Sequence, residues 1–465
     1  MRKKQLVTYD TALPIFAEIV LEDLGPKLLE SGLFLRDVSG KLTFVVPDEN
    51  WEASYRQVSE RVASEIPNYV DGAGYAFSTP DQLFDTSLKD RKGAATTHLV
   101  LPRSKRTQRV WLVDRRAVGQ DWLQQPSPRS QTVPIVVFAS IKGGVGRSTA
   151  LCVLAAHLAS KGRRVLAVDM DLEAPGLGTM LLSPETMPKF GLLDYIVEAA
   201  HASVSDELML ETAGPSWLAA GRGRIDVVPA VGSTAGTYPE NVLSKIARAY
   251  LASNSDDIGA FSHVVSDYLA RITADSKYDV VLVDARAGLH ETTASAILGL
   301  GGDVYLFGVN QPQTIAGYNY LLSHVASRTS KEDGFWGRLH FVQAKSLGEK
   351  VDSGFSDAIE LILKTRLFSS KDRTPDLDDL ADDFEVDWVE SSGVEDSEAG
   401  VGYSEFMDEI SFISIPESES YRSFDPLLTP DLLQHSRYSQ PYSEFLSDVE
   451  GVLDDYYSQR NSDAS

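Results

Sequence analysis

The stretch that decides the fold is SIKGGVGRSTA, residues 140–150. It follows the apolar run IVVFAS at 135–140 and leads into STALCVLAAHLASKG at 148–162, so a strand, a glycine-rich loop and a helix are predicted in succession. In that context the loop N–H groups and the helix N-terminus can hold a phosphate chain. A tight turn without a ligand would account for the glycines, but not for the two cations and the hydroxyl groups among them.

Each residue type in this loop suits a phosphate site. The small residues let the backbone approach an anion without a side-chain clash, and we expect the loop lining to be Gly143, Gly144, Val145 and Gly146. Ser148 places a hydroxyl where Mg²⁺ would bind, and Thr149 follows near the base of a nucleotide. Arg147 stands where such a loop normally carries lysine, and its planar guanidinium does not simply replace an ammonium nested among backbone amides. We therefore expect nucleotide binding to survive better than fast hydrolysis.

The pattern of strand and helix continues along the rest of the chain. The further apolar runs are RVLAVDM at 164–170, IDVVPA at 225–230, YDVVLVDA at 278–285, DVYLFGV at 303–309, LHFVQA at 339–344 and ISFISIP at 410–416. Continuous rather than alternating hydrophobicity indicates strands that are covered on both faces. The α/β alternation predicts a doubly wound, mostly parallel sheet over residues 135–460.

The region before this sheet has a different pattern. Residues 1–125 combine helical spacing at 12–31 and 49–66 with the strand-like KLTFVV at 41–46 and with two strands around the polar turn RSKRTQ. They predict a small mixed α/β accessory domain. Residues 126–134, rich in Pro, Ser and Gln, predict a linker.

Composition limits the classes of function. The 465 residues carry 43 Lys and Arg against 67 Asp and Glu, a net charge of −24, so the chain as a whole repels nucleic acid and anionic membranes. Cys152 is the only cysteine, which excludes a disulfide framework and a thiolate metal cage within one chain. The eight histidines lack ligand spacing, so no metal beyond Mg²⁺ is expected. The basic N-terminus lacks the apolar run of a signal peptide and no segment is apolar enough to span a bilayer, so we expect a soluble cytoplasmic protein.

Three motifs together carry a family resemblance. KGGVGRST, VDMDLEAPGLG and YDVVLVDARAG resemble the deviant P-loop ATPases of the ParA/MinD group, over roughly residues 133–450. The resemblance implies binding of ATP with Mg²⁺, ATP-dependent homodimerisation, and hydrolysis. Lys142 matches the family's signature lysine, which reaches across the dimer interface to the partner's nucleotide. Adenine rather than guanine is implied by the resemblance alone.

The resemblance also implies roles for individual residues. Ser148 matches the Mg²⁺ ligand, and Asp284 matches the aspartate that holds Mg²⁺ through water. Asp171 matches the residue that orients the attacking water, and Asp169 beside it is a further candidate for the metal site. Gly288 matches the glycine near the γ-phosphate. With Lys142 and Arg147, Asp171 completes the expected catalytic set, since phosphoryl transfer requires mostly positioning and charge neutralisation.

Two further positions resemble the family's adenine-contacting loops. Gln343 ends a predicted strand and Pro416 follows another, and we expect both near the base. Arg286, where relatives often have proline, could offer a second cation to the phosphates, or could form an ordinary salt bridge on a loop.

Candidate partner surfaces lie outside the loop. A segment at about 370–400 is strongly acidic: residues 372–398 hold twelve acids against one base, interleaved with apolar residues, which predicts either a solvated insertion or a partner-binding element. Residues 89–129 hold ten bases against three acids, with Trp111 and Trp122 interleaved, which suits nucleic acid, a solvated face, or a docking surface for the acidic segment. The acidic C-terminal end argues against membrane cycling.

Three functions remain open. The leading one is an ATP-dependent switch that dimerises around ATP, engages a protein partner and is released by slow hydrolysis. The second is a nucleotide-binding regulatory scaffold that does not hydrolyse, with Arg147 locking the ATP state. The third is a bacterial tyrosine-kinase-like enzyme, because such kinases end in tyrosine clusters and this chain has Tyr438, Tyr442, Tyr456 and Tyr457 near its C-terminus.

Overall fold

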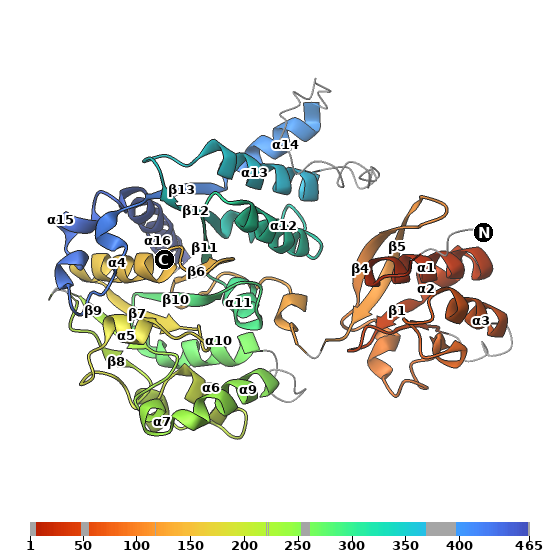
Figure 1. Ribbon diagram of the computed structural model, residues 1–465, viewed down its shortest axis with the longest axis horizontal. Helices are drawn as coiled ribbons and strands as arrows, with labels where there is room; N and C mark the ends of the chain where they lie inside the picture. Colours follow the sequence, from red (N-terminus) through yellow and green to blue (C-terminus); the bar gives the residue numbers. More distant parts are fainter. Residues whose placement is uncertain are drawn as a thin grey trace. The chain divides into compact units, whose positions relative to one another are not determined.

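The computed structural model describes residues 6–47, 55–116, 118–219, 221, 223–252, 261–368 and 397–463 (Figure 1). These residues divide into two compact units, one within Met1–Ala117 and the other comprising Val118–Phe368 and the chain from Val394 to Ser465. Most of the acidic segment at about 370–400 lies outside the described residues.

The first unit is a five-stranded mixed sheet with helices. Its elements are α1 (Tyr9–Leu24), α2 (Pro26–Ser31), β1 (Leu33–Arg36), β2 (Leu42–Val45), α3 (Arg56–Glu65), β3 (Phe77–Ser78), β4 (Ala95–Val100) and β5 (Thr107–Asp114). The strand order is β3-β2-β1-β5-β4, and β4 and β5 form the antiparallel hairpin that the sequence predicts. The rings of Phe16, Phe34, Phe44 and Phe77 pack together in its core with centroids 4.8–6.5 Å apart, edge to face except for the tilted pair Phe16 and Phe44.

The second unit is an eight-stranded sheet covered on both faces. Its strands are β6 (Ile135–Ser140), β7 (Arg164–Asp169), β8 (Gly214–Pro215), β9 (Arg224–Val228), β10 (Val280–Ala287), β11 (Asp303–Gly308), β12 (Leu339–Ser346) and β13 (Ser411–Pro416). The order is β13-β12-β11-β6-β10-β7-β9-β8, and every pair is parallel except β8 with β9. The doubly wound, mostly parallel α/β sheet is confirmed.

Helices occupy both faces of this sheet. They are α4 (Arg147–Ser160), α5 (Leu177–Leu181), α6 (Leu192–Ala199), α7 (Asp206–Leu210), α8 (Thr234–Thr237), α9 (Val242–Ala252), α10 (Phe261–Ile272), α11 (Glu291–Ala294), α12 (Pro312–Ala326), α13 (Ser353–Leu363), α14 (Ser397–Asp408), α15 (His435–Tyr438) and α16 (Ser443–Asp463). None of the helices in the described part of the chain has the long apolar run that a bilayer crossing needs.

Strand β6 explains why its sequence is apolar at every position. Val136 and Phe138 pack into the layer formed by α4 and α16, whereas Ile135, Val137 and Ala139 pack into the layer formed by α10 and α12 (Figure 1). A strand with two buried faces has no position left for a polar side chain, and this places β6 at the centre of the sheet.

The larger unit begins before the boundary predicted at residue 125. Asp121 accepts hydrogen bonds from the hydroxyls of Ser262 and Ser295 at 2.7 and 2.8 Å, and Trp122 is buried in the core of the larger unit. The predicted linker is also attached to this unit, since the N–H of Ser127 donates to the Leu298 carbonyl at 2.7 Å. The polar composition of this stretch reflects hydrogen bonds to the larger unit.

Candidate functional site

The glycine-rich loop lies where a ligand site is expected in this architecture. Strand β6 pairs with β10 on one side and β11 on the other, and the loop at 141–146 leaves its carboxyl end to start α4. Gly144 and Gly146 have φ of +73° and +88°, values that side-chain-bearing residues rarely adopt. A Cβ added at Gly143, Gly144 or Gly146 would meet nothing within 4 Å, so the loop borders open space.

Four of the predicted site residues converge beside this loop. Nε of Arg147 donates to Oδ1 of Asp284 at 2.5 Å, and Nη1 donates to Oγ of Ser140 at 3.2 Å. Nη2 of Arg147 lies 3.6 Å from Oδ2 of Asp171. Oγ of Ser148 donates to the other oxygen of Asp284, also at 2.5 Å. The guanidinium is therefore committed to the carboxylates at the end of the sheet.

Asp169 has a different environment from its two neighbours in the site. It is fully buried, and its oxygens accept the N–H groups of Asp171, Gly176 and Leu177 at 3.0–3.1 Å. These bonds fix the chain that follows β7, so both oxygens of Asp169 are already engaged. Asp284 is likewise hydrogen-bonded through both oxygens, to Arg147 and Ser148, so the metal roles of Ser148, Asp169 and Asp284 stay predictions.

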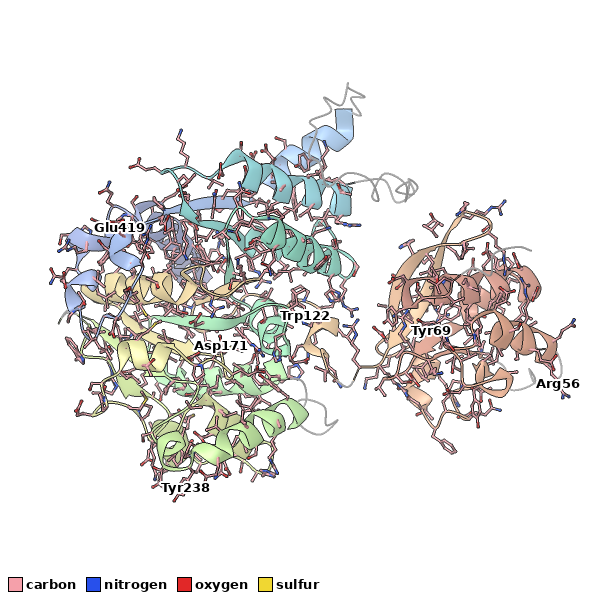
Figure 2. All side chains as sticks on the ribbon, viewed as in Figure 1. Arg56, Tyr69, Trp122, Asp171, Tyr238 and Glu419 are labelled. Carbon is pink, nitrogen blue, oxygen red and sulfur yellow. The ribbon has the colours of Figure 1, made fainter. Side chains whose placement is uncertain are left out.

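Burial dominates the acid–base behaviour of these carboxyl groups. Removal from water, helped by the nearby charge of Asp284, raises the pKa of Asp169 to about 7. Burial also raises the pKa of Asp171, although the Arg147 guanidinium opposes the shift. In Figure 2, Asp171 lies in the interior of the larger unit and Glu419 at its surface. The site thus concentrates acidic groups in a region of low dielectric constant.

Three further cations lie around the site. Nζ of Lys142 donates to Oε1 of Gln311 at 3.1 Å, and this contact is exposed. Nη1 of Arg286 lies 2.5 Å from Oε1 of Glu173, so the salt-bridge interpretation of Arg286 describes this structure. Nζ of Lys345 donates to the carbonyl of Gly144 at 2.7 Å. The sequence did not point to Lys345, because it lies beyond the predicted strand at 339–344.

A cavity of about 340 Å³ adjoins the loop. Gly144 and Gly146 of the loop line it together with Thr149 and Pro416, the two residues among them that were expected near the base. Its remaining lining is Val145, Met180, Phe307, Ala344, Lys345, Ile415, Glu417, Ser418, Tyr421, Arg422, Phe424 and Tyr442.

The structure places Gln343 away from the cavity, so a contact of Gln343 with the base stays a prediction. Ala344 faces the α4 layer, where the cavity lies, and strand alternation turns Gln343 to the opposite face. There its side chain exchanges hydrogen bonds with Asp352, through Nε2 to Oδ2 at 3.2 Å and through Oε1 from the backbone N–H at 2.6 Å. Gly288 holds its predicted place beside the loop, since its N–H donates to the Ser140 carbonyl at 2.8 Å.

The residues around the loop fit a nucleoside triphosphate with Mg²⁺. The loop offers backbone groups and open space, and Ser148 and Asp284 bring a hydroxyl and a carboxylate together. The described residues contain no cluster of three or more His, Cys, Asp or Glu that could cage a metal. Mg²⁺ suits such a site, because it keeps several waters and takes phosphate oxygens as ligands.

The basic segment at 89–129 is divided between the two units. Several of its cations are neutralised: Arg103 pairs with Glu22 and Glu65, and Arg116 with Asp114. Trp111 carries the guanidinium of Arg91 at 4.8 Å and that of Arg109 at 5.4 Å, and Trp122 is buried. The stacking surface expected of a nucleic-acid site is therefore reduced, and a nucleic-acid partner stays a prediction.

The tyrosines near the C-terminus do not form an accessible cluster. Tyr438, Tyr442 and Tyr456 are at most 6% exposed, and the hydroxyl of Tyr457 donates to the Asp279 carbonyl at 2.6 Å. The tyrosine-kinase alternative thus loses the feature that motivated it.

Comparison with known proteins gives two kinds of match. Residues 136–252 match the CobQ/CobB/MinD/ParA nucleotide binding domain. Over 183 residues the chain is 31% identical to the antiactivator FleN of Pseudomonas aeruginosa. The matched region covers 39% of this chain and 53% of FleN, so the chain spans about half the length of this curated relative.

Solved structures give weaker likenesses. A ParA family ATPase from Chlorobium tepidum is 18% identical, with a TM-score of 0.40, covering 68% of this chain and 97% of the other. MinD of Pyrococcus horikoshii, solved in complex with Mg-ADP, is 19% identical, with a TM-score of 0.31, covering 45% of this chain and 70% of the other.

Proposed function

We propose, from the match of residues 136–252 to the CobQ/CobB/MinD/ParA nucleotide binding domain, that the chain is an ATP-dependent molecular switch that hydrolyses ATP slowly and regulates a partner. The observation that supports this most directly is the convergence of Ser148, Asp171 and Asp284 beside the open glycine loop. These groups come from α4, from the end of β7 and from β10, and the parallel sheet brings them to one edge.

ATP binding would use the loop and the cavity together. The N–H groups at the start of α4 attract the phosphate chain, and the cavity beside Thr149 and Pro416 receives the base. Ser148, together with Asp284 through water, would hold Mg²⁺, which neutralises charge on the phosphates when it is bound. Opening the hydrogen bond between Ser148 and Asp284 would accompany this.

Hydrolysis would depend on Asp171 and be limited by Arg147. The carboxylate of Asp171 accepts the N–H of Ala174 at 3.2 Å, which holds it for orienting an attacking water. Arg147 is 9% exposed, its Nε donates to Asp284 and its Nη1 donates to Ser140, so its hydrogen-bonding groups are already engaged by the protein. A cation whose donor groups are already engaged by carboxylates and hydroxyls has less capacity to stabilise the charge that develops on the phosphates.

Regulation would proceed through a dimer. Lys142 lies on the exposed side of the loop, where a second copy of the chain could bring its nucleotide. One relative is named an antiactivator, so we propose that the ATP-bound dimer restrains a protein partner. The first unit and the acidic segment at about 370–400 are the regions that would recognise it.

The test is calorimetric titration of the folded protein with Mg·ATP, combined with its melting temperature. A ligand at about a hundred times its dissociation constant stabilises by about 2.7 kcal/mol, so binding predicts both heat and a raised melting temperature. Ser148→Ala should weaken Mg·ATP binding by about tenfold or more. Ser160→Ala, at the other end of α4, should leave binding unchanged. Absence of both heat and thermal stabilisation in the wild-type protein would refute the switch.

A second candidate function follows from the position of Arg147. With its guanidinium tied to Asp284 and close to Asp171, the site could bind ATP without turning it over and serve as a regulatory scaffold. Both candidates share the nucleotide site, and they differ only in phosphate release, for which the Arg147→Lys variant is the discriminating experiment.

A further inference from the structure

The loop lacks a free ammonium at its usual position. Arg147 stands where lysine is expected, and its nitrogens are engaged by Asp284, Ser140 and Asp171. Lys142 extends to Gln311 on the exposed side. A triphosphate in the loop therefore needs another cation close to the phosphate chain.

Lys345 has the position for this task. Its Nζ lies 2.7 Å from the carbonyl oxygen of Gly144, in the middle of the loop, and its side chain lines the cavity together with Gly146 and Thr149. The ammonium thus lies between the loop and the space into which a nucleotide would extend.

An irregularity in strand β12 directs the side chain of Lys345 toward the loop. In the pairing of β12 with β13, Ala344 is opposite Ile415 and Ser346 is opposite Pro416, so Lys345 forms a bulge. Its φ is +56°, in the left-handed region that residues other than glycine rarely adopt. A bulge re-aims a side chain, and such irregular backbone is common beside functional sites.

Lys345 is also available for a ligand. Among the described residues, none of the ion pairs involves Lys345, and its ammonium has the Gly144 carbonyl as hydrogen-bond acceptor. Arg422 lines the same cavity but is paired with Glu417 at 3.1 Å. Of Lys345 and Arg422, only Lys345 would form a new ion pair when a polyanion binds, because Arg422 is already paired with Glu417.

Resting on the proposed ATP site, we infer that Lys345 binds the phosphate chain of the nucleotide and supplies the ammonium that position 147 lacks. Lys345 exchanges its bond to the neutral Gly144 carbonyl for one to an anionic phosphate oxygen, a stronger charge-assisted hydrogen bond. The role is in binding, so affinity rather than turnover is the primary readout.

The experiment compares Mg·ATP affinity of the full chain, by calorimetry, in the wild type and in Lys345→Ala, Lys345→Gln and Lys345→Arg. We expect the alanine and glutamine variants to lose about tenfold in affinity and the arginine variant to recover most of it. The dependence of affinity on salt should be less steep without the cation, because one screened charge contact is missing. Lys277→Ala removes the same charge just before β10, at the amino end of the parallel strands and so at the end opposite the loop. It should change neither the affinity for Mg·ATP nor the salt dependence of that affinity.

Three outcomes would overturn the inference. One is an unchanged affinity in Lys345→Ala while the wild type binds ATP, which leaves the proposed function intact. Another is a loss that the arginine variant does not recover, with the salt dependence unchanged, which would make Lys345 a support of loop shape only. The third is a wild type that binds no ATP, which refutes the proposed function itself. Melting temperatures without nucleotide establish that each variant is folded.

Discussion

At the scale of single residues, Arg147 defines how this site differs from an ordinary phosphate loop. Its guanidinium is planar and forked, so it bonds Asp284 through Nε and Ser140 through Nη1 at the same time. A lysine ammonium at this position would have one nitrogen and a flexible stem. The positive charge of Arg147 is therefore held in a different position from that of a lysine, because its guanidinium donates to several acceptors in fixed directions.

We predict that Arg147→Lys increases phosphate release by about tenfold, because an ammonium can leave the carboxylates and follow the phosphates. Phosphate release with Mg·ATP measures it, and Asp171→Ala provides the baseline without hydrolysis. Arg164→Lys is the matched control, since Arg164 pairs with Asp279 at the beginning of β7. A wild-type rate equal to the Asp171→Ala baseline would favour the non-hydrolysing scaffold, and a lysine variant no faster than wild type would contradict the role given to Arg147.

At the scale of elements, the docking of α16 depends on a buried histidine at the edge of the sheet opposite the loop. His340 of β12 has its ring 4.4 Å from that of Tyr305, with Nδ1 3.1 Å from Oδ1 of Asp448 on α16 and Nε2 4.0 Å from Oδ1 of Asp303. Arg129 also pairs with Asp303. Burial acts to lower the pKa of His340, but the two carboxylates outweigh it and raise the pKa above 6.5.

This pair predicts a pH-dependent stability. A histidine whose folded pKa is raised contributes stability that is complete below pH 6.5 and is lost as the pH rises through the folded pKa. The pKa of Asp448 is lowered: burial opposes the shift, but the contacts with His340 outweigh it, so its contribution persists until strongly acidic pH. Asp448→Asn should therefore reduce stability by about 1–2 kcal/mol near pH 6 and flatten the decline toward about pH 9.

The measurement is the melting temperature as a function of pH in the wild type and in Asp448→Asn. Asp454→Asn removes the same charge from an exposed position of α16 and should leave the profile unchanged. A wild-type profile that is flat between about pH 6 and about pH 9 would contradict the ion pair.

At the scale of the whole molecule, the nucleotide site is contained in the larger unit, and the first unit has a separate aromatic core. The loop, the cavity and the carboxylates belong to residues 140–442. Signalling between ATP and a partner would then depend on assembly of two chains around nucleotide.

We predict that Lys142→Ala abolishes ATP-dependent dimerisation while Mg·ATP binding to the monomer falls by less than about tenfold, because we propose that the ammonium contacts the nucleotide of the other chain. Light scattering of the wild type should report a mass near two chains with Mg·ATP and near one chain without it. The Lys277→Ala variant should behave as wild type. A mass that does not change with ATP in the wild type would argue against the dimer.

The sequence predicted the architecture well because its signals are local. The seven apolar runs from residue 135 onward became strands, and their side chains pack into both faces of a covered sheet. The loop glycines and Ser148 follow from the same local order of strand, loop and helix, whereas Asp284 was expected only from the family resemblance. The boundary expected from the sequence, at residue 125, is several residues later than the start of the larger unit at Val118. The polar residues in between have the composition of a linker, although buried Asp121 and Glu291 hold them in the larger unit.

What the sequence determined by itself is the phosphate loop and the sheet that carries it, since glycine spacing and apolar runs act within a few residues of chain. What only the tertiary structure decided is where the charged and polar side chains point. Arg147 is directed to Asp284, Gln343 to the face away from the cavity, and Lys345 to the Gly144 carbonyl. These partners are separated by 137, 9 and 201 positions, and the direction of a side chain depends on a register or a bulge that chain order does not encode locally.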